Sequence, residues 1–220
     1  MTSARSLEGV TRKIVGYDPG GNGRHGVAAL IVEDGRPVEV SFATVKSAHA
    51  ALCWLTAGGL PFAAGIDTLT VLCMGESGWR PADRWLRQRY PRVRNSVVNP
   101  NYLQGSMALN GLAVMGSLRR TDSNIVISES HPKVLYFHLE SAQYAYSENQ
   151  RTMNATLSRW VGLSIETTTE HEWDAVISCY AVFEGLTGRW ASDLHQLPSH
   201  DSQLLVDLAG PSHFYWPNRD

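Results

Sequence analysis

Ile14-Val-Gly-Tyr-Asp18-Pro-Gly-Gly-Asn-Gly23 is a short apolar run that ends in an aspartate and a glycine-rich turn. A second apolar run occupies Gly26 to Glu33, and the turn signal Asp34-Gly35 separates it from a third run, Val38 to Val45. Apolar runs of this length, divided by Gly and Asp, are typical of strands joined as hairpins. The sequence therefore predicts three consecutive antiparallel strands.

The segment after these strands has the pattern of a crossover connection. Ser47 can cap a helix that runs to about Ala57, where Gly58-Gly59 ends it. Pro61 to Leu72 is then a mostly apolar stretch that contains Asp67. Because a helix between two strands allows them to lie parallel, this stretch is predicted to be a buried parallel strand.

The rest of the chain combines helices with one more strand. A strand is predicted over Asn124 to Ser130, and the last long helix starts at Thr169, which is spaced from Glu172 as in a capping box. Other helices are predicted at Pro81 to Tyr90, Ser106 to Leu118, from Pro132 onward, and at Thr156 to Val161. This order predicts an α/β domain with a mixed sheet of three antiparallel strands plus parallel strands, flanked by helices.

The composition is that of an ordinary globular chain. Its 220 residues are 43% hydrophobic and 18% charged, which excludes disordered, collagen-like and coiled-coil classes. The net charge of -2 gives no overall attraction to nucleic acid or anionic membrane. Cys53, Cys73 and Cys179 lie in apolar stretches without metal-type spacing, and the first residues lack an apolar signal core. We expect a soluble cytoplasmic protein with buried free thiols.

Four acidic residues occupy similar places in the predicted elements. Asp18 and Glu129 end strands, Asp67 interrupts an apolar strand, and Asp174 lies in the first turns of the last helix. Carboxylates are seldom buried without partners, so an aspartate between Ile66 and Leu69 requires a cation, a hydrogen-bond network or a turn. Mg²⁺ and Mn²⁺ prefer oxygen ligands, and three or four converging carboxylates can hold a pair of them.

Four segments carry a resemblance to a known group of proteins. They are Val15-Gly-Tyr-Asp18-Pro-Gly, Gly65-Ile-Asp67, Glu129-Ser-His-Pro132 and His171-Glu-Trp-Asp174-Ala175. In this order they resemble the RNase H-like superfamily, and within it a family of predicted nucleases catalogued as a domain of unknown function. The last segment is similar to the His-x-x-Asp-Ala of RuvC-type nuclease domains. Thr68-Leu69 departs from the family, which usually has a small residue and Pro after the second Asp.

The resemblance implies a fold and a chemistry. It covers residues 13–190, which would form one RNase H-like domain between an N-terminal extension, 1–12, and a C-terminal tail, 191–220. It implies a metal-dependent phosphodiesterase in which Asp18, Glu129 and Asp174 hold Mg²⁺ or Mn²⁺. Asp67 would be a fourth ligand or lie just behind, and His171 would share the catalytic helix face with Asp174.

Each of these acidic residues also has a purely structural interpretation. Asp18 can begin the turn before Gly20, Asp67 and Thr68 can cap a bend, and Glu129 can be a surface acid. Asp174 can favour the positive end of its helix. His171 can be a solvated or capping group.

A basic segment lies between Trp79 and Arg94. It holds six arginines against the single acid Asp83, a local charge of +5. Arginine binds phosphate with two parallel hydrogen bonds, and Trp85 and its aromatic neighbours can stack on unpaired bases, so the segment is a candidate nucleic-acid contact. The alternative is a solvated helix with Trp85 and Leu86 packed inward. The arginines are Arg80, Arg84, Arg87, Arg89, Arg92 and Arg94.

Three functions remain open from the sequence. The leading hypothesis is a divalent-metal-dependent nuclease acting on DNA or RNA, because an ordered acidic set accompanies the arginine segment. The second is an RNase H-like scaffold that binds nucleic acid or protein without turnover. The third is an actin-like ATPase, suggested by the glycine-rich turn after Asp18. A second metal site of His195, His200 and Asp201 is disfavoured by its irregular spacing, while Asn99, Tyr102 and Gln104 are possible polar contacts beside the arginines.

Overall fold

The structure is a computed structural model that describes residue 7 and residues 9–99, 105–198 and 205–218. It begins with an antiparallel meander of β1 (Thr11–Asp18), β2 (His25–Glu33) and β3 (Arg36–Val45). The predicted hairpins are confirmed. Asp18 is the last residue of β1 and pairs with Gly26 of β2, so the glycine-rich turn lies at the carboxyl end of β1.

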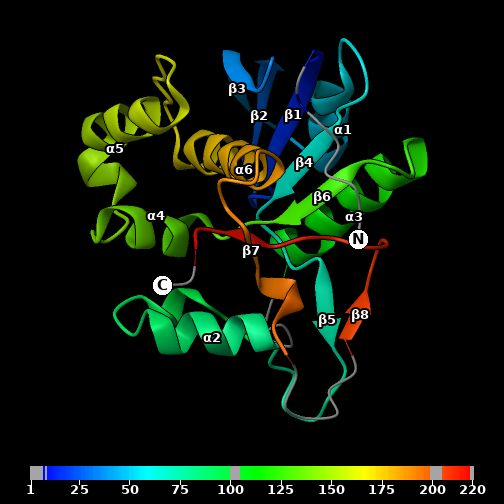
Figure 1. Ribbon diagram of the computed structural model, residues 1–220, viewed down its shortest axis with the longest axis vertical. Coiled ribbons are helices and arrows are strands. Elements are labelled where there is room, and N and C mark those ends of the chain that lie inside the picture. Colours follow the sequence, from blue (N-terminus) through cyan, green and yellow to red (C-terminus); the bar gives the residue numbers. More distant parts are fainter. Residues whose placement is uncertain (1–6, 8, 100–104, 199–204, 219–220) are drawn as a thin grey trace.

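Two parallel strands complete the main sheet (Figure 1). Helix α1 (Ala48–Thr56) crosses to β4 (Ala63–Ile66), which runs parallel to β1, and β6 (Val126–Glu129) runs parallel to β4. The five strands lie in the order β3-β2-β1-β4-β6. The fold class is thus as predicted, a mixed sheet of three antiparallel strands plus parallel strands.

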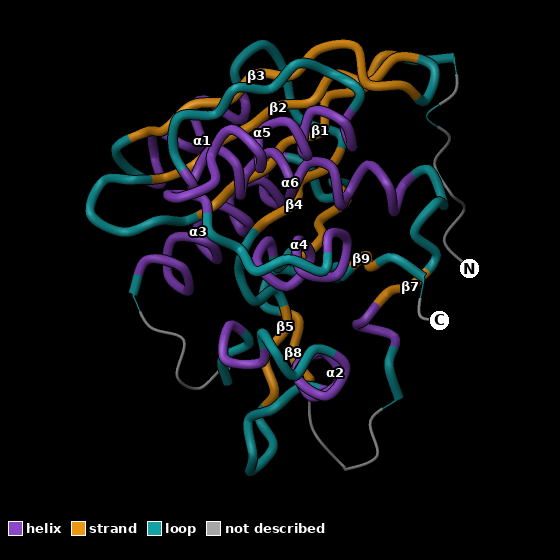
Figure 2. The backbone as a smooth tube through the Cα atoms, turned by 90° about the vertical axis from the view of Figure 1, so that its left-hand side faces the viewer, coloured by secondary structure: helices purple, strands orange, loops and turns teal. Residues whose placement is uncertain are grey.

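Helices cover both faces of this sheet (Figures 1 and 2). Helix α6 (Glu170–Leu186) packs on β1, β2 and β4, while α1 and α3 (Ser106–Thr121) pack on the opposite face. Glycines allow α6 to lie close: a Cβ on Gly16 would stand 1.9 Å from the Ala175 carbonyl oxygen, and one on Gly65 would stand 2.1 Å from that of Ser178. The start of α6, with Asp174, therefore lies directly over the strand ends.

The prediction of one strand from Pro61 to Leu72 is wrong in one respect, because the strand ends at Ile66. The Asp67 amide donates to the Tyr17 carbonyl at 3.0 Å, and the Thr68 amide turns back to the Ile66 carbonyl at 2.9 Å. The chain leaves the main sheet there and forms β5 (Val71–Cys73) in a separate pair with β8 (Leu205–Asp207). Asp67 is therefore in the loop after β4, beside the end of β1, and not inside a strand.

The described residues beyond 190 pack against the body. Strand β7 (Ser192–Asp193) pairs with β9 (Tyr215–Trp216), and Phe214 and Trp216 are buried. His213 lies along the free edge of β6, where it accepts from the Glu129 amide at 2.7 Å and donates to the Ile127 carbonyl at 2.9 Å. The C-terminal segment thus extends the edge of the sheet beside Glu129.

Among the described residues, the remaining elements are three helices and two short 3-10 turns. Helix α5 is longer than predicted, because it starts ten residues before Thr156. Val97 and Val98 are in no strand and follow a short 3-10 turn. The bounds are α2 (Pro81–Arg89), η1 (Arg94–Ser96), α4 (Pro132–Glu140), α5 (Tyr146–Val161) and η3 (Leu194–Gln196).

The cysteines differ from expectation at one position. Cys73 and Cys179 are buried thiols outside any disulfide, as predicted, but Cys53 is exposed. Cys53 lies on α1, whose buried residues are Ala51 and Leu55, so its side chain falls on the outer face of that helix. None of the described helices has the length and apolar character needed to cross a membrane.

Candidate active site

A pocket of about 490 Å³ opens where β1, β4 and β6 end beneath the start of α6. All five residues that the sequence singles out as catalytic line this pocket, although they come from distant parts of the chain. They are Asp18, Asp67, Glu129, His171 and Asp174. Leu69, Val97, Val98 and Met107 add an apolar part to the wall, and Lys133 adds a positive charge.

Three of the acids form what we call the aspartate cluster: Asp18, Asp67 and Asp174. Asp18 and Asp174 are both only 4% exposed, and Asp67 is partly exposed. Burial and the negative charge of Asp18 raise the pKa values of Asp67 and Asp174 well above the ordinary aspartate value. Lys133 offsets part of this repulsion at both residues. The cluster thus collects negative charge, while Arg80, the buried arginine in the wall of the same pocket, is paired with Glu129 and Asp83.

Two side chains hold single oxygens of the aspartate cluster. His171 Nδ1 lies 2.5 Å from Asp18 Oδ2, a contact that raises the pKa of His171 and favours its charged form. Tyr144 donates its hydroxyl to Asp174 Oδ1 at 2.8 Å. Burial and the neighbouring Asp174 raise the pKa of Tyr144, so it remains a donor at any physiological pH. Tyr144 lies in the connection between α4 and α5, where no spacing in the sequence marks it.

Glu129 does not join the aspartate cluster, and strand register explains why. Glu129 is in register with Ile66, whose side chain packs on the α1 and α3 face of the sheet. Successive side chains of a strand point to opposite faces, so Ser130, and not Glu129, points to the α6 face. Accordingly, the Ser130 hydroxyl lies 2.6 Å from that of Ser178 on α6.

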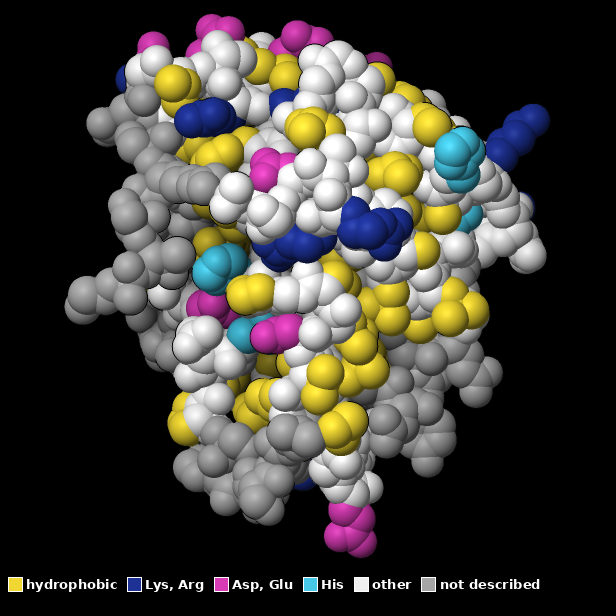
Figure 3. Space-filling model, turned by 90° about the vertical axis from the view of Figure 1, so that its right-hand side faces the viewer, with side chains coloured by type: hydrophobic (Ala, Val, Ile, Leu, Met, Phe, Trp, Pro, Cys, Tyr) yellow, Lys and Arg dark blue, Asp and Glu magenta, His cyan; other side chains and the backbone are white. Residues whose placement is uncertain are grey.

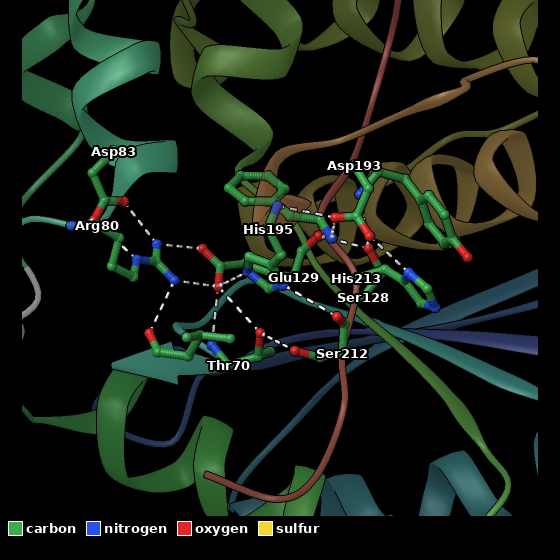
Figure 4. Close-up of polar contacts among 12 residues, drawn as sticks. Thr70, Arg80, Asp83, Ser128, Glu129, Asp193, His195, Ser212 and His213 are labelled. Atoms are coloured by element: carbon green, nitrogen blue, oxygen red, sulfur yellow. Dashed lines mark hydrogen bonds and ion pairs between the residues drawn. The ribbon is translucent and has the colours of Figure 1, made fainter. Parts of the chain in front are cut away.

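Glu129 instead belongs to a buried ion-pair network (Figure 4). Arg80 Nη1 donates to Glu129 Oε2 at 2.7 Å and Nη2 donates to Oε1 at 2.6 Å. Arg80 also donates to Asp83, from Nε to Oδ2 at 2.9 Å and from Nη2 to Oδ1 at 2.7 Å. We call Arg80, Asp83, Glu129 and Thr70 the Arg80 cluster. Arg80 and Glu129 are only 2% and 3% exposed.

The electrostatics of Glu129 are opposite to those of the aspartates. Burial alone would raise its pKa, but Arg80 at contact distance lowers it far below the ordinary glutamate value. His195 Nε2, from the C-terminal segment, lies 3.5 Å from Glu129 Oε2 and lowers the same pKa further. Glu129 is therefore a stably ionised carboxylate with its charge already balanced.

A divalent cation suits the donor set of the aspartate cluster, because three carboxylates offer hard oxygen ligands and excess negative charge. Among the described residues, no three or more His, Cys, Asp or Glu side chains are grouped so that they could hold a metal ion. Asp18, Asp67 and Asp174 are the candidate ligands that share the pocket. Glu129 is not among these candidates, because both of its carboxylate oxygens accept hydrogen bonds from Arg80.

The basic segment is divided between the interior and the surface. Arg80 is buried in its cluster, and Arg87 donates to the carbonyls of Arg94 and Val97 at 2.7 and 2.8 Å while lying over Trp79. Trp85 packs edge-on against Tyr90 and Trp216. The exposed arginines are Arg84, Arg89, Arg92 and Arg94.

Surface charge elsewhere is mixed. On the face shown in Figure 3, basic and acidic side chains are interspersed with hydrophobic ones, and no single sign covers it. Asn99 is buried and donates to the Ser77 carbonyl at 2.9 Å, which gives it a structural partner. Tyr102, Gln104, His200 and Asp201 lie outside the described residues. The exposed arginines of the α2 region remain the candidate phosphate contacts.

Comparisons with known proteins give a structural likeness. No family model matches the sequence, and no curated protein matches it. Two solved structures of RuvC from Thermus thermophilus are similar in fold, one alone and one in complex with a Holliday junction substrate. Each has a TM-score of 0.45 and covers 80% of this chain and 96% of its own, at 12% and 14% identity.

Proposed function

We propose that this protein is a divalent-metal-dependent nuclease that hydrolyses phosphodiester bonds in DNA or RNA at the aspartate cluster. One observation carries the proposal: three aspartates from β1, the loop after β4 and α6 line one pocket, and burial together with the negative charge of Asp18 raises the pKa of Asp67 and of Asp174. Such mutual repulsion disfavours three bare carboxylates, whereas a bound cation converts it into attraction.

In this proposal Asp18, Asp67 and Asp174 hold Mg²⁺ or Mn²⁺. The metal, when bound, lowers the pKa of a coordinated water and stabilises charge on the phosphate oxygens, so no nucleophilic side chain is needed. His171 and Tyr144 each engage one oxygen of Asp18 and Asp174, which orients the second oxygen of each carboxylate. The exposed arginines of the α2 region contact the phosphates on either side of the scissile bond.

A cleavage assay tests this proposal. Labelled single-stranded, duplex and branched DNA and RNA are incubated with the protein in Mg²⁺, Mn²⁺ or EDTA. Asp18→Asn and Asp174→Asn should each lower the rate at least about 100-fold, because the metal contributes several kcal/mol of transition-state stabilisation. Glu184→Gln, which removes a carboxylate paired with Arg189 outside the pocket, is the matched control and should retain the rate. Cleavage that persists in EDTA or in both Asn variants contradicts the proposal.

A binding scaffold without turnover is the second candidate, and the Arg80 cluster favours it. Glu129, which the resemblance implies as a metal ligand, has its charge neutralised by Arg80. Isothermal titration calorimetry with Mn²⁺ separates the two candidates. The nuclease should bind Mn²⁺ and lose that heat in Asp174→Asn, whereas the scaffold should bind nucleic acid with no Mn²⁺ heat at all.

A further inference from the structure

The loop that carries Asp67 is fixed by hydrogen bonds on both sides of Leu69. Thr68 donates its hydroxyl to the Met107 carbonyl at 2.7 Å. Thr70, which is fully buried, donates its amide and its hydroxyl to Glu129 Oε2 at 2.9 and 3.3 Å. The loop therefore takes its shape from α3 on one side and from Glu129 on the other.

Arg80 in turn fixes Glu129. Its Nη1 donates to the Val71 carbonyl at 3.1 Å as well as to Glu129, and its other contacts go to Asp83 and Glu129. These bonds use all five N–H donors of the guanidinium. Arg80 thus has no donor left for a phosphate, and Glu129 has its charge matched by a partner that cannot turn away without losing five bonds.

We infer that Arg80 and Glu129 are positioning residues that set the place of Asp67 in the aspartate cluster. The chain of contacts runs from Arg80 to Glu129, from Glu129 to Thr70, and along the loop to Asp67. This inference rests on the proposed function, since Asp67 is there a metal ligand. It assigns to Glu129 a role behind the ligands and to Asp67 a role among them.

The assignment also accounts for the departure after Asp67. A Pro in place of Leu69 would supply loop rigidity by its own ring. Here Thr68 and Thr70 supply the rigidity through their side chains, and their partners are the Met107 carbonyl and Glu129. The Arg80 cluster thus supplies the loop rigidity that a proline would otherwise provide.

The test compares Glu129→Gln and Arg80→Lys with the control Glu184→Gln, which disrupts a similar ion pair with Arg189 away from the pocket. The first readout is metal-free: backbone NMR shifts of residues 67–70 and hydrogen exchange of the Thr70 amide. Both cluster variants should shift these signals and speed that exchange, and the control should not. Unchanged signals in both cluster variants overturn the inference.

The second readout is Mn²⁺ affinity by calorimetry. Loss of a partner that orients a ligand typically weakens metal binding 10- to 100-fold, so we expect about that loss in Glu129→Gln with the number of bound ions unchanged. Arg80→Lys should lose less, because it keeps the charge. A lower number of bound ions in Glu129→Gln, as expected for Asp174→Asn, makes Glu129 a direct ligand and overturns the inference. Affinity within twofold of wild type also overturns it.

Failure of the proposed function gives a different pattern. If wild-type protein binds no Mn²⁺ and cleaves nothing, the nuclease proposal fails and the metal-free NMR readout alone decides the positioning role. Displaced Asp67 signals in Glu129→Gln and Arg80→Lys then support it, and undisplaced signals overturn it. Both substitutions retain most of the side-chain volume, so folding is expected to survive.

Discussion

The aspartate cluster and the Arg80 cluster lie at the same end of one sheet and have opposite electrostatics. Asp67 and Asp174 have raised pKa values, because low solvation and the negative charge of Asp18 disfavour their ionised forms. Glu129 has a lowered pKa, because burial is outweighed by Arg80. A carboxylate paired with a buried cation stabilises the fold, whereas carboxylates that repel one another destabilise it and are typical of sites that bind a ligand.

The two clusters are separated by the pleat of the sheet. Side chains alternate across a strand, so Asp18 faces α6 while Glu129, in register with Ile66, faces the other way. The four candidate catalytic acids that line the pocket are therefore not one set of four. Substitutions in the two clusters should therefore change different properties. The expected effects are given from the largest to the smallest.

The largest effect is expected from Arg80→Met. It leaves Glu129 and Asp83 buried without their cation, and breaking a buried ion pair from one side typically costs about 3 to 5 kcal/mol. Urea unfolding at neutral pH, followed by circular dichroism, measures the loss. Arg189→Met, whose arginine is 51% exposed, is the control and should cost about 1 kcal/mol or less. Equal losses in the two variants would contradict the prediction that the Arg80 cluster stabilises the fold more than an exposed ion pair does.

The next effect has the opposite sign. Asp174→Asn removes one of three repelling charges and keeps an oxygen that can accept from Tyr144. Relief of this repulsion should make the metal-free variant more stable than wild type, by about 0.5 to 2 kcal/mol, the range usual for stabilising single substitutions. Thermal unfolding in EDTA measures this gain. A variant less stable than wild type in EDTA would show that Asp174 serves the fold, and the contrast between the clusters would fail.

The sequence predicts the features that depend on neighbouring residues, and it misses those that depend on contacts between residues far apart in the chain. The hairpins and the crossover follow from local turn residues, and Asp18 and Glu129 lie at strand ends as predicted. The break after Ile66 was not predicted, because it depends on the Asp67 amide finding the Tyr17 carbonyl of a distant strand. The partner of Glu129 was missed for the same reason: Arg80 is 49 residues away and reads as one more cation in a basic run.

Trp85 shows a further limit of the basic segment as a signal. The sequence offers both a stacking platform and an inward-packed residue, and the structure places Trp85 against Tyr90 and Trp216. Trp216 comes from a segment with no periodic pattern, so no spacing could pair the two. Tyr144 was also missed, since a tyrosine in a helix connection carries no local mark of its contact with Asp174.

The pH dependence of stability should show both clusters at once. Asp67 and Asp174 have folded pKa values above the ordinary 3.8, so their contribution is present at low pH and is lost as pH rises through the raised values. Glu129 has a folded pKa below the ordinary 4.5, so its contribution is present above that value and is lost as pH falls. Urea unfolding in EDTA should therefore give a maximum at mildly acidic pH.

Added metal separates the two arms of that curve. Mg²⁺ at millimolar concentration should remove the decline on the high-pH side, since it binds the ionised aspartates, and should leave the acid side unchanged. Asp174→Asn should flatten the high-pH side without metal. A stability that rises steadily from pH 4 to 8 in EDTA would contradict the repulsion within the aspartate cluster.

The smallest effects on stability are expected at the exposed arginines. Arg84→Ala, Arg89→Ala, Arg92→Ala and Arg94→Ala should each change the free energy of unfolding by no more than about 0.5 kcal/mol, since surface substitutions rarely do more. Their effect should appear in nucleic-acid binding, because each lost phosphate contact lowers the slope of log affinity against log salt by about 0.7 for a single strand. Fluorescence anisotropy with labelled single-stranded DNA at several salt concentrations measures that slope. Arg80→Lys should leave the slope unchanged, because all donors of Arg80 are used inside the protein. A slope that falls for Arg80→Lys and not for the exposed arginines would place the phosphate contact at the buried end of α2 and join the two clusters into one binding site.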